Sequence, residues 1–267
     1  MAGAPLKPAA FAYEAPESLS DALSLVSEDA RPLAGGQSLV PMLNFRLASP
    51  SLLVDLNGID ELSYLHEDDG SLRIGALTRQ ATVERSKEVK RRWPLLNQTL
   101  RVVGHAAIRN RGTIGGSVAH ADPAAELPVA LVTLDAQFVL RSAARGERIV
   151  AAADMFLGPL TTALAADELL TEVAIPPLPR RARTVFVEHA RTHGDFALAG
   201  AAVVVAPGEH AAIGLLGAGA IPVRASEAEQ ALLDGARSGH VAALAAAEVK
   251  DDYRRALITE LVRQALE

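Results

Sequence analysis

A glycine-rich stretch in the middle of the chain holds the residues best suited to chemistry. Residues 104–126, GHAAIRNRGTIGGSVAHADPAAE, bring Gly112, Gly115 and Gly116 close together, and Thr113 and Ser117 flank the last two glycines. Glycine tolerates positive φ and lets a ligand approach the main chain, and successive backbone N–H groups in such a turn form an anion-binding concavity. The stretch therefore predicts a phosphate-binding loop, to which the two hydroxyl groups can add donors.

A second glycine pair occurs about 80 residues earlier. Gly35 and Gly36 follow a short apolar segment and precede Gln37 and Ser38, a pattern that indicates a strand ending in a loop of backbone donors. A Gly-Gly dipeptide alone is typical of an ordinary turn. Its similarity to residues 114–117 favours a stronger interpretation, in which the two loops clamp one extended pyrophosphate from both sides.

Four ionisable residues of the central stretch could serve other chemistry. The spacing of His105, His120, Asp122 and Glu126 does not match known zinc motifs, so we expect no metal site. The two acids could form a general acid/base pair. A carboxylate beside a phosphate clamp more often accepts hydrogen bonds from sugar hydroxyls, and we favour that role for Glu126. Asp122 precedes Pro123 and is either such an acceptor or a turn-former.

No side chains indicate catalysis by the protein itself. Gly-x-Ser-x-Gly is absent and no nucleophile lies beside a base, so we predict no catalytic residue. Arg109 and Arg111 could pair with phosphate or with acids of a partner, or could be solvated. Any reaction in which the chain takes part would then be carried by a bound cofactor that the protein positions.

Composition excludes several classes of protein. The 267 residues are 49% hydrophobic and carry a formal net charge of −6, which argues against nucleic acid as a partner. There are no cysteines, so the chain cannot hold an iron–sulfur cluster through its own thiolates. The sequence has no apolar signal-peptide region and no apolar run long enough to span a membrane, and we expect a cytoplasmic protein.

The helices and strands that must position these residues are predicted from hydrophobic periodicity, from capping residues and from turn residues. In the first part we expect an amphipathic helix over 16–28, capped by Ser18, and strands over 52–56 and 71–77 around a turn at 67–70. A helix should follow over 79–89, capped by Thr78. Another should run from Pro94 to about residue 103, with Trp93 packed before it. After the central stretch we expect a buried helix from Leu127 and a hairpin of 137–140 with 148–150.

A run of prolines and arginines at 175–183 marks a domain boundary. Beyond it we expect strands over 184–189, 197–205 and 211–216, and then three helices, the first opened by a capping box of Ser226 and Glu229 and the others over 240–250 and 252–266. A run of strands followed by a run of helices indicates an α+β fold.

Three segments together resemble the FAD-binding medium subunit of the molybdenum hydroxylases, the family of carbon monoxide dehydrogenase and xanthine dehydrogenase. They are residues 34–56, 108–128 and 191–205, in the family's order. The resemblance implies an FAD-binding domain of the vanillyl-alcohol-oxidase (PCMH) type over 1–175, with subdomains of about 1–57 and 58–175. It also implies a C-terminal flavoprotein domain over 176–267, with a three-stranded antiparallel sheet and three helices.

The same resemblance implies which residues contact FAD. The first pyrophosphate loop would be Ala34, Gly35, Gly36, Gln37 and Ser38, flanked by Leu33 and Leu39. The second would be Thr113, Ile114, Gly115, Gly116 and Ser117. Val103 and His105 would lie near the isoalloxazine ring, Glu126 near the sugar chain, and Ile175 against the cofactor. Glu188 and His189 occupy a region where some members of the family carry a lysine.

The function implied by the resemblance is electron transfer. A flavin subunit without its own clusters would receive electrons from a small [2Fe-2S] subunit, after substrate oxidation in a large molybdopterin subunit, and pass them to an external acceptor. We expect a heterotrimer that dimerises. The alternatives are a stand-alone FAD-dependent oxidoreductase and a flavin-free scaffold subunit, and the intact glycine loops argue against the second.

Overall fold

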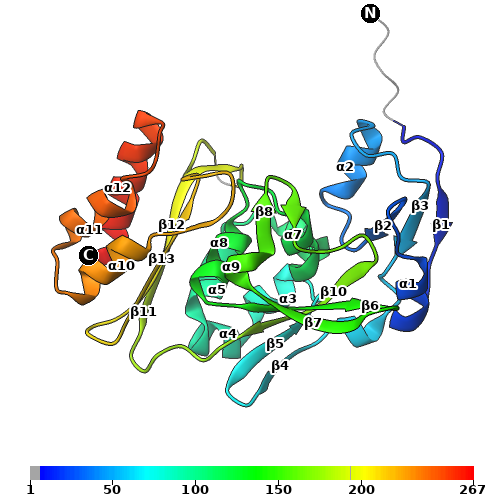
Figure 1. Cartoon of the computed structure of the whole chain (residues 1–267), viewed down its shortest axis with the longest axis horizontal. Helices are drawn as coiled ribbons and strands as arrows, with labels where there is room; N and C mark the ends of the chain where they lie inside the picture. Colours follow the sequence, from blue (N-terminus) through cyan, green and yellow to red (C-terminus); the bar gives the residue numbers. More distant parts are fainter. Residues whose placement is uncertain (1–6, 193) are drawn as a thin grey trace, which may run out of the picture.

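The computed structural model describes residues 7–192 and 194–267, and three groups of elements follow one another along its long axis (Figure 1). The first is a parallel sheet of order β1-β3-β2 with two helices. Its elements are β1 Ala12–Glu14, α1 Leu19–Leu25, β2 Ala30–Leu33, α2 Leu39–Asn44 and β3 Leu52–Asp55. Leu33 pairs with Asp55, so parallel β2 and β3 end at the same edge. The predicted first helix is confirmed, because the Ser18 hydroxyl accepts from the Asp21 amide at 3.1 Å.

The middle group is an antiparallel sheet of order β4-β5-β10-β6-β7 with helices on it. The strands are β4 Leu65–Asp68, β5 Ser71–Gly75, β6 Gln137–Ser142, β7 Gly146–Ala151 and β10 Glu168–Ile175. The helices are α3 Gln80–Arg85, α4 Lys87–Arg92, α5 Pro94–Leu100, α6 Ala106–Arg111, α7 Ile114–His120 and α8 Glu126–Thr133. A 3-10 turn Asp60–Leu62, α9 Ala152–Met155 and a small hairpin of β8 Phe156–Gly158 and β9 Thr161–Thr162 complete it.

Two expectations for this middle group are wrong. The turn at 67–70 joins β4 to β5, whereas β3 belongs to the other sheet. The helix expected over 79–89 is two helices, because Ser86 ends α3 and caps α4 by accepting from the Val89 amide. Thr78 caps neither of them. Its hydroxyl donates to the Tyr64 carbonyl at 2.7 Å, and this bond ties the strand end to the preceding loop.

The C-terminal group is a four-stranded antiparallel sheet of order β11-β12-β13-β14, covered by three helices. Its elements are β11 Arg183–Ala190, β12 Ala197–Ala206, β13 His210–Leu216, β14 Val223–Arg224, α10 Ser226–Leu233, α11 Ser238–Ala245 and α12 Asp252–Leu266. The three predicted strands are confirmed and a short fourth one joins them. The capping box is wrong, because Glu229 accepts instead from the Ile213 amide and from Arg224.

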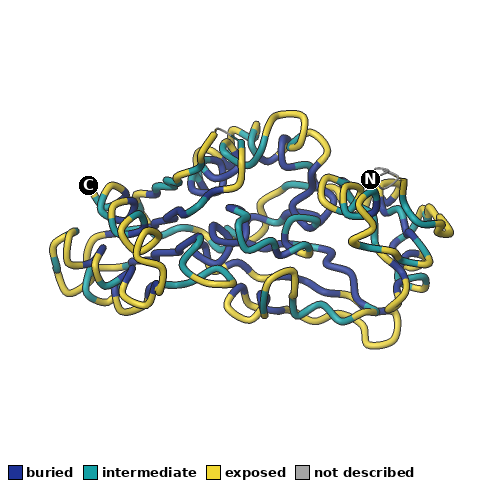
Figure 2. The backbone as a smooth tube through the Cα atoms, turned by 90° about the horizontal axis from the view of Figure 1, so that it is seen from above, coloured by how far each residue is buried: buried dark blue, intermediate teal, exposed yellow. Residues whose placement is uncertain are grey.

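The largest hydrophobic core runs through the middle group and into the C-terminal sheet. Helices α5 and α8 lie between the five-stranded sheet and β11–β13 (Figure 1). Every residue of α8 is buried, and Figure 2 shows the buried backbone running through the interior of the molecule. Trp93 is fully buried as predicted, and its indole N–H donates to the Pro176 carbonyl at 2.9 Å. The core includes Ala202 and Val204 of β12. A boundary at 175/176 therefore stays a prediction. Of the helices described, none is both long and apolar enough to cross a bilayer.

Candidate functional site

The first glycine loop connects the end of β2 to the start of α2. Gly36 has φ of +72°, a conformation that L side chains rarely adopt. Gly35 lies directly against the central stretch, since a Cβ atom added to it would be 2.2 Å from the Arg111 carbonyl oxygen. Residues 34–38 and 111–112 therefore approach each other main chain to main chain, and only glycine at position 35 permits this contact.

The amides of this loop are available to a ligand. Among the described residues, no acceptor meets the N–H groups of residues 35–38, and the helical bonds begin only at the Val40 amide, which donates to Gly36. The Gln37 side chain folds back to donate to the Gly35 carbonyl at 3.0 Å. A row of unpaired amides at a glycine loop suits an anionic group such as a diphosphate.

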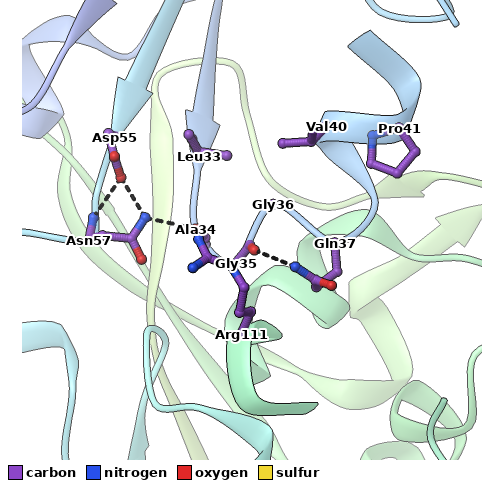
Figure 3. Close-up of a pocket in the computed structure, with 10 residues that line it drawn as sticks. All are labelled: Leu33, Ala34, Gly35, Gly36, Gln37, Val40, Pro41, Asp55, Asn57 and Arg111. Carbon is purple, nitrogen blue, oxygen red and sulfur yellow. Dashed lines mark hydrogen bonds between the residues drawn. The ribbon is translucent and has the colours of Figure 1, made fainter. Parts of the chain in front are cut away.

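A pocket of about 430 Å³ opens beside this loop. Figure 3 shows its walls, which come from the first loop, α2, the end of β3 and the last residue of α6: Leu33, Ala34, Gly35, Gly36, Gln37, Val40, Pro41, Asp55, Asn57 and Arg111. Leu33 and Asp55 meet here because β2 and β3 are parallel and end at one edge. The predicted residues 33–37 thus line one pocket, while Ser38 and Leu39 start the adjoining helix and are absent from its lining.

Two side chains that sequence reasoning missed hold the loop in place. The Asn57 amide nitrogen donates to the Ala34 carbonyl at 2.8 Å, and its oxygen accepts from Arg79 at 2.7 Å. Arg79 also donates to the Arg111 carbonyl at 2.6 Å. These bonds fasten the first loop to the central stretch. The available signal was position, because Asn57 follows the strand end that lies beside the glycine loop.

The charged groups that line the pocket are the Arg111 guanidinium and the Asp55 carboxyl, and the Arg79 guanidinium lies near that of Arg111. Burial and the neighbouring charge of Arg111 lower the pKa of Arg79. The Arg111 side chain has no ion-pair or hydrogen-bond partner among the described residues. Asp55 is held by other bonds: burial would raise its pKa, but hydrogen bonds from Tyr13 and Asn57 lower it below its ordinary value. Two adjacent cations, one of them unpaired, favour a bound anion.

The second glycine motif lies beside the first but does not offer its amides. Residues 114–117 form the first turn of α7, where the Thr113 hydroxyl accepts from the Gly116 amide at 3.0 Å. The amides of Ile114 and Gly115 donate to the carbonyls of Thr78 and Ala76 at 3.0 and 2.8 Å. These amides are thus paired within the protein, and contacts of residues 113–117 with a cofactor stay predictions. A Cβ on Gly116 would lie 3.6 Å from that of Ala34, so the two motifs do adjoin.

The start of the third family-like segment, residues 191–205, packs on residues 103–105, which precede α6. Gly194, with φ of +81°, is so close to His105 that an added Cβ would lie 2.5 Å from the ring carbon Cε1. Arg109 fixes this segment, since it donates to the carbonyls of Val103 and Gly104 at 3.0 Å and pairs with Glu84 at 2.8 Å. Arg109 is thus a structural residue, whereas Arg111 faces the pocket.

The predicted acidic residues differ in their surroundings. Glu126 is only 5% exposed, and burial, with a smaller contribution from Asp122, raises its pKa to about 7. Asp122 accepts from the Ala124 amide at 2.8 Å, which is a turn-forming bond, and lies 3.9 Å from His120. Ile175 is fully buried at the end of β10. Contacts of these residues with a cofactor stay predictions.

Comparison with known proteins gives consistent matches over nearly the whole chain. Residues 9–178 match the family described as the FAD binding domain in molybdopterin dehydrogenase. The 6-hydroxypseudooxynicotine dehydrogenase complex subunit alpha of Paenarthrobacter nicotinovorans is 40% identical, covering 98% of this chain and 95% of the relative. The carbon monoxide dehydrogenase medium chain of Hydrogenophaga pseudoflava is 33% identical over 97% and 96%. A solved carbon monoxide dehydrogenase from Hydrogenophaga pseudoflava, lacking the Mo-pyranopterin moiety, superposes with a TM-score of 0.91 at 35% identity, over 97% of this chain and 96% of the other.

Proposed function

This chain belongs to the family of FAD-binding domains in molybdopterin dehydrogenases, and on that premise we propose that it is the electron-transfer subunit of a heteromeric molybdenum hydroxylase. The fold is that of the family's medium subunit, as the three sequence motifs predicted. The proposed role is to hold FAD, to receive electrons from a partner and to pass them to an external acceptor.

The observation that carries the proposal is the close contact between Gly35 and the main-chain carbonyl of Arg111. It creates a cradle that a Cβ would fill, and it places the amides of residues 35–38 beside the Arg111 guanidinium, all without partners in the described part of the chain. These donors suit the diphosphate of FAD, and Gly116 of the second motif adjoins Ala34 of the same loop. The residues present therefore fit the cofactor. FAD, when bound, supplies a centre that can take up and release electrons singly or in pairs.

The chain's own residues bind and orient the cofactor. The 35–38 amides and Arg111 would hold the diphosphate, and Asn57 with Arg79 keeps the loop in position. The segment 103–105, fixed by Arg109 and covered by the turn at Gly194, forms the expected ring end. No nucleophile or general base is needed for this role, which agrees with a site built from main-chain groups and cations.

The partner subunits are inferred from composition and from relatives. This chain has no cysteine and so cannot ligate an iron–sulfur cluster through thiolates. Relatives are named as a complex subunit and as a medium chain. We expect a small [2Fe-2S] subunit to reduce the flavin, a large molybdopterin subunit to oxidise the organic substrate, and the resulting heterotrimer to dimerise.

The test is to purify the full chain with its neighbouring gene products and to follow the flavin spectrum. Reduction of the [2Fe-2S] partner should be followed by bleaching of FAD on this chain. A chain that stays colourless when FAD is added would support the flavin-free scaffold instead. Oxidation of an organic substrate by the isolated, FAD-loaded chain would support the stand-alone oxidoreductase.

A further inference from the structure

Asp55 is a carboxylate in a pocket that otherwise suits an anion. It lines the same pocket as the 35–38 loop and Arg111 (Figure 3). Burial opposes its ionised form, but hydrogen bonds from Tyr13 and Asn57 outweigh burial and lower its pKa, so the group is charged at neutral pH. A negative charge beside a bound diphosphate weakens binding unless the carboxylate itself accepts a hydrogen bond from the ligand.

The carboxylate of Asp55 has room for one more donor. A carboxylate offers about four acceptor positions on its two oxygens. Oδ1 accepts from the backbone N–H of Asn57 at 3.0 Å and from the side-chain amide of the same residue at 2.5 Å. Oδ2 accepts from the Tyr13 hydroxyl at 2.5 Å and from no other group in the described part of the chain. One acceptor position on Oδ2 is therefore left for a ligand.

A metal ion explains this acid less well than a hydrogen-bond donor does. The charges around Asp55 are the guanidinium groups of Arg79, which helps to lower its pKa, and of Arg111, which lines the same pocket. Both groups repel a cation. The residues that the structure describes contain no cluster of three or more histidines and acids able to hold a metal ion. The expected partner of Oδ2 is thus an uncharged donor of the ligand.

The position of Asp55 indicates which donor this is. Asp55 is paired with Leu33, and the glycine loop begins at the next residue, Ala34. A group bound to Asp55 therefore lies next to the diphosphate, and in FAD the donors next to the diphosphate are the hydroxyls of its two sugar chains. The ring end expected at 103–105 lies at the opposite end of α6 from Arg111. The ribityl chain then leads away from the pocket, and the ribose of adenosine is left for Asp55.

The remaining wall of the pocket suits a nucleoside. Leu33, Val40 and Pro41 give it apolar surface, and Val40 is exposed although its side chain is apolar. A planar base can cover such a surface, as is usual in pockets that combine apolar walls with a few placed polar groups. An anion cradle, a hydroxyl acceptor and an apolar wall are together the groups that recognise ADP.

We propose that Asp55 is a specificity-determining residue that accepts a hydrogen bond from a hydroxyl of the adenosine ribose, so that this pocket takes the ADP half of FAD in its ribose form. The proposal rests on the proposed function and adds to it a residue that no sequence motif indicated. The predicted contact of Glu126 with the sugar chain of the flavin concerns the other half of the cofactor.

The test is to titrate the FAD-free full chain with ADP, 2′-deoxy-ADP and 3′-deoxy-ADP in the presence of EDTA. We expect ADP to bind, and the analogue that lacks the contacted hydroxyl to bind about tenfold more weakly, the effect of a lost charge-assisted hydrogen bond. Asp55→Asn should reduce this difference several-fold, because an amide oxygen accepts a weaker, uncharged hydrogen bond. Asp29→Asn, an exposed acid at the opposite end of β2, should preserve the difference.

Equal binding of the three nucleotides by the wild type would overturn the proposal, whether or not Asp55→Asn folds. A uniform weakening of all three by Asp55→Asn, with the preference for ADP intact, would also overturn it, because a loosened loop has that effect. ADP binding that requires Mg²⁺ would assign Asp55 to a metal ion instead. FAD is titrated in parallel. Tight FAD binding without any hydroxyl preference among the nucleotides leaves the proposed function standing, whereas binding of neither FAD nor ADP overturns both.

Discussion

Gly35 lies against the main-chain carbonyl of Arg111, so close that a Cβ on the glycine would be 2.2 Å from the oxygen. This contact joins two glycine motifs that are some 75 residues apart in the sequence and places the free amides of one beside the guanidinium of the other. It defines the site, because the pocket has walls on both sides of the join (Figure 3).

Gly35→Ala should therefore weaken FAD binding by about tenfold or more, since relieving the clash moves the loop away from Arg111. FAD titration followed by flavin fluorescence measures the effect. Gly239→Ala is the matched control, because Gly239 lies in α11 with open space around its Cα and should bind FAD as the wild type does. Wild-type affinity in Gly35→Ala would contradict the cradle.

Arg111→Gln should weaken FAD binding by roughly tenfold to a hundredfold, the range of a lost charge-assisted hydrogen bond. Stability should hardly change, because the side chain is exposed and has no partner among the described residues. The wild-type dissociation constant should rise with salt, and the variant's should rise less steeply. Arg237→Gln, an exposed arginine at the start of α11, is the control. An unchanged salt dependence would place the anion elsewhere.

Thr113→Ala should destabilise the protein by about 1–2 kcal/mol, because it removes the hydroxyl that caps α7. Thr113→Ser keeps the hydroxyl and should stay near the wild type in urea unfolding. The same variants test the second motif. If it acts by placing Gly116 beside Ala34, the alanine variant binds FAD more weakly. Tighter binding would mean that the freed Gly116 amide reaches the cofactor, contrary to the observed bonding.

The sequence indicated most elements correctly because their signals are local. Ser18 caps α1, Pro94 starts α5, and the strands of the C-terminal group alternate with turns as expected. Gly115 and Gly116 predict a loop at residues 114–117, because glycine tolerates positive φ and lets a ligand approach the main chain. The structure overrides that preference: Thr113 caps the turn, and Gly115 fits where a Cβ would be 2.5 Å from that of Ala76.

The parts of the site that were missed depend on contacts between distant residues. Asn57 holds the Ala34 carbonyl across 23 residues, and Arg79 holds the Arg111 carbonyl across 32. No local pattern encodes either bond, because the first needs β2 and β3 to end at the same edge and the second needs α3 and α6 to pack together.

The pH dependence of stability should report the buried carboxyl of Glu126. Its pKa in the folded chain is about 7, against an ordinary 4.5, because the side chain is buried and lies near Asp122. The folded chain thus keeps a proton that the unfolded chain releases, and stability from this group is full below about pH 4.5 and is lost as pH rises to about 7. Glu126→Gln removes the effect. Relative to the wild type, the free energy of unfolding of Glu126→Gln should increase by on the order of 2–3 kcal/mol between pH 4.5 and pH 8. Urea unfolding of the FAD-free chain measures this difference. A difference that stays constant across this range would mean that Glu126 ionises normally, and hence that water reaches it in the folded protein.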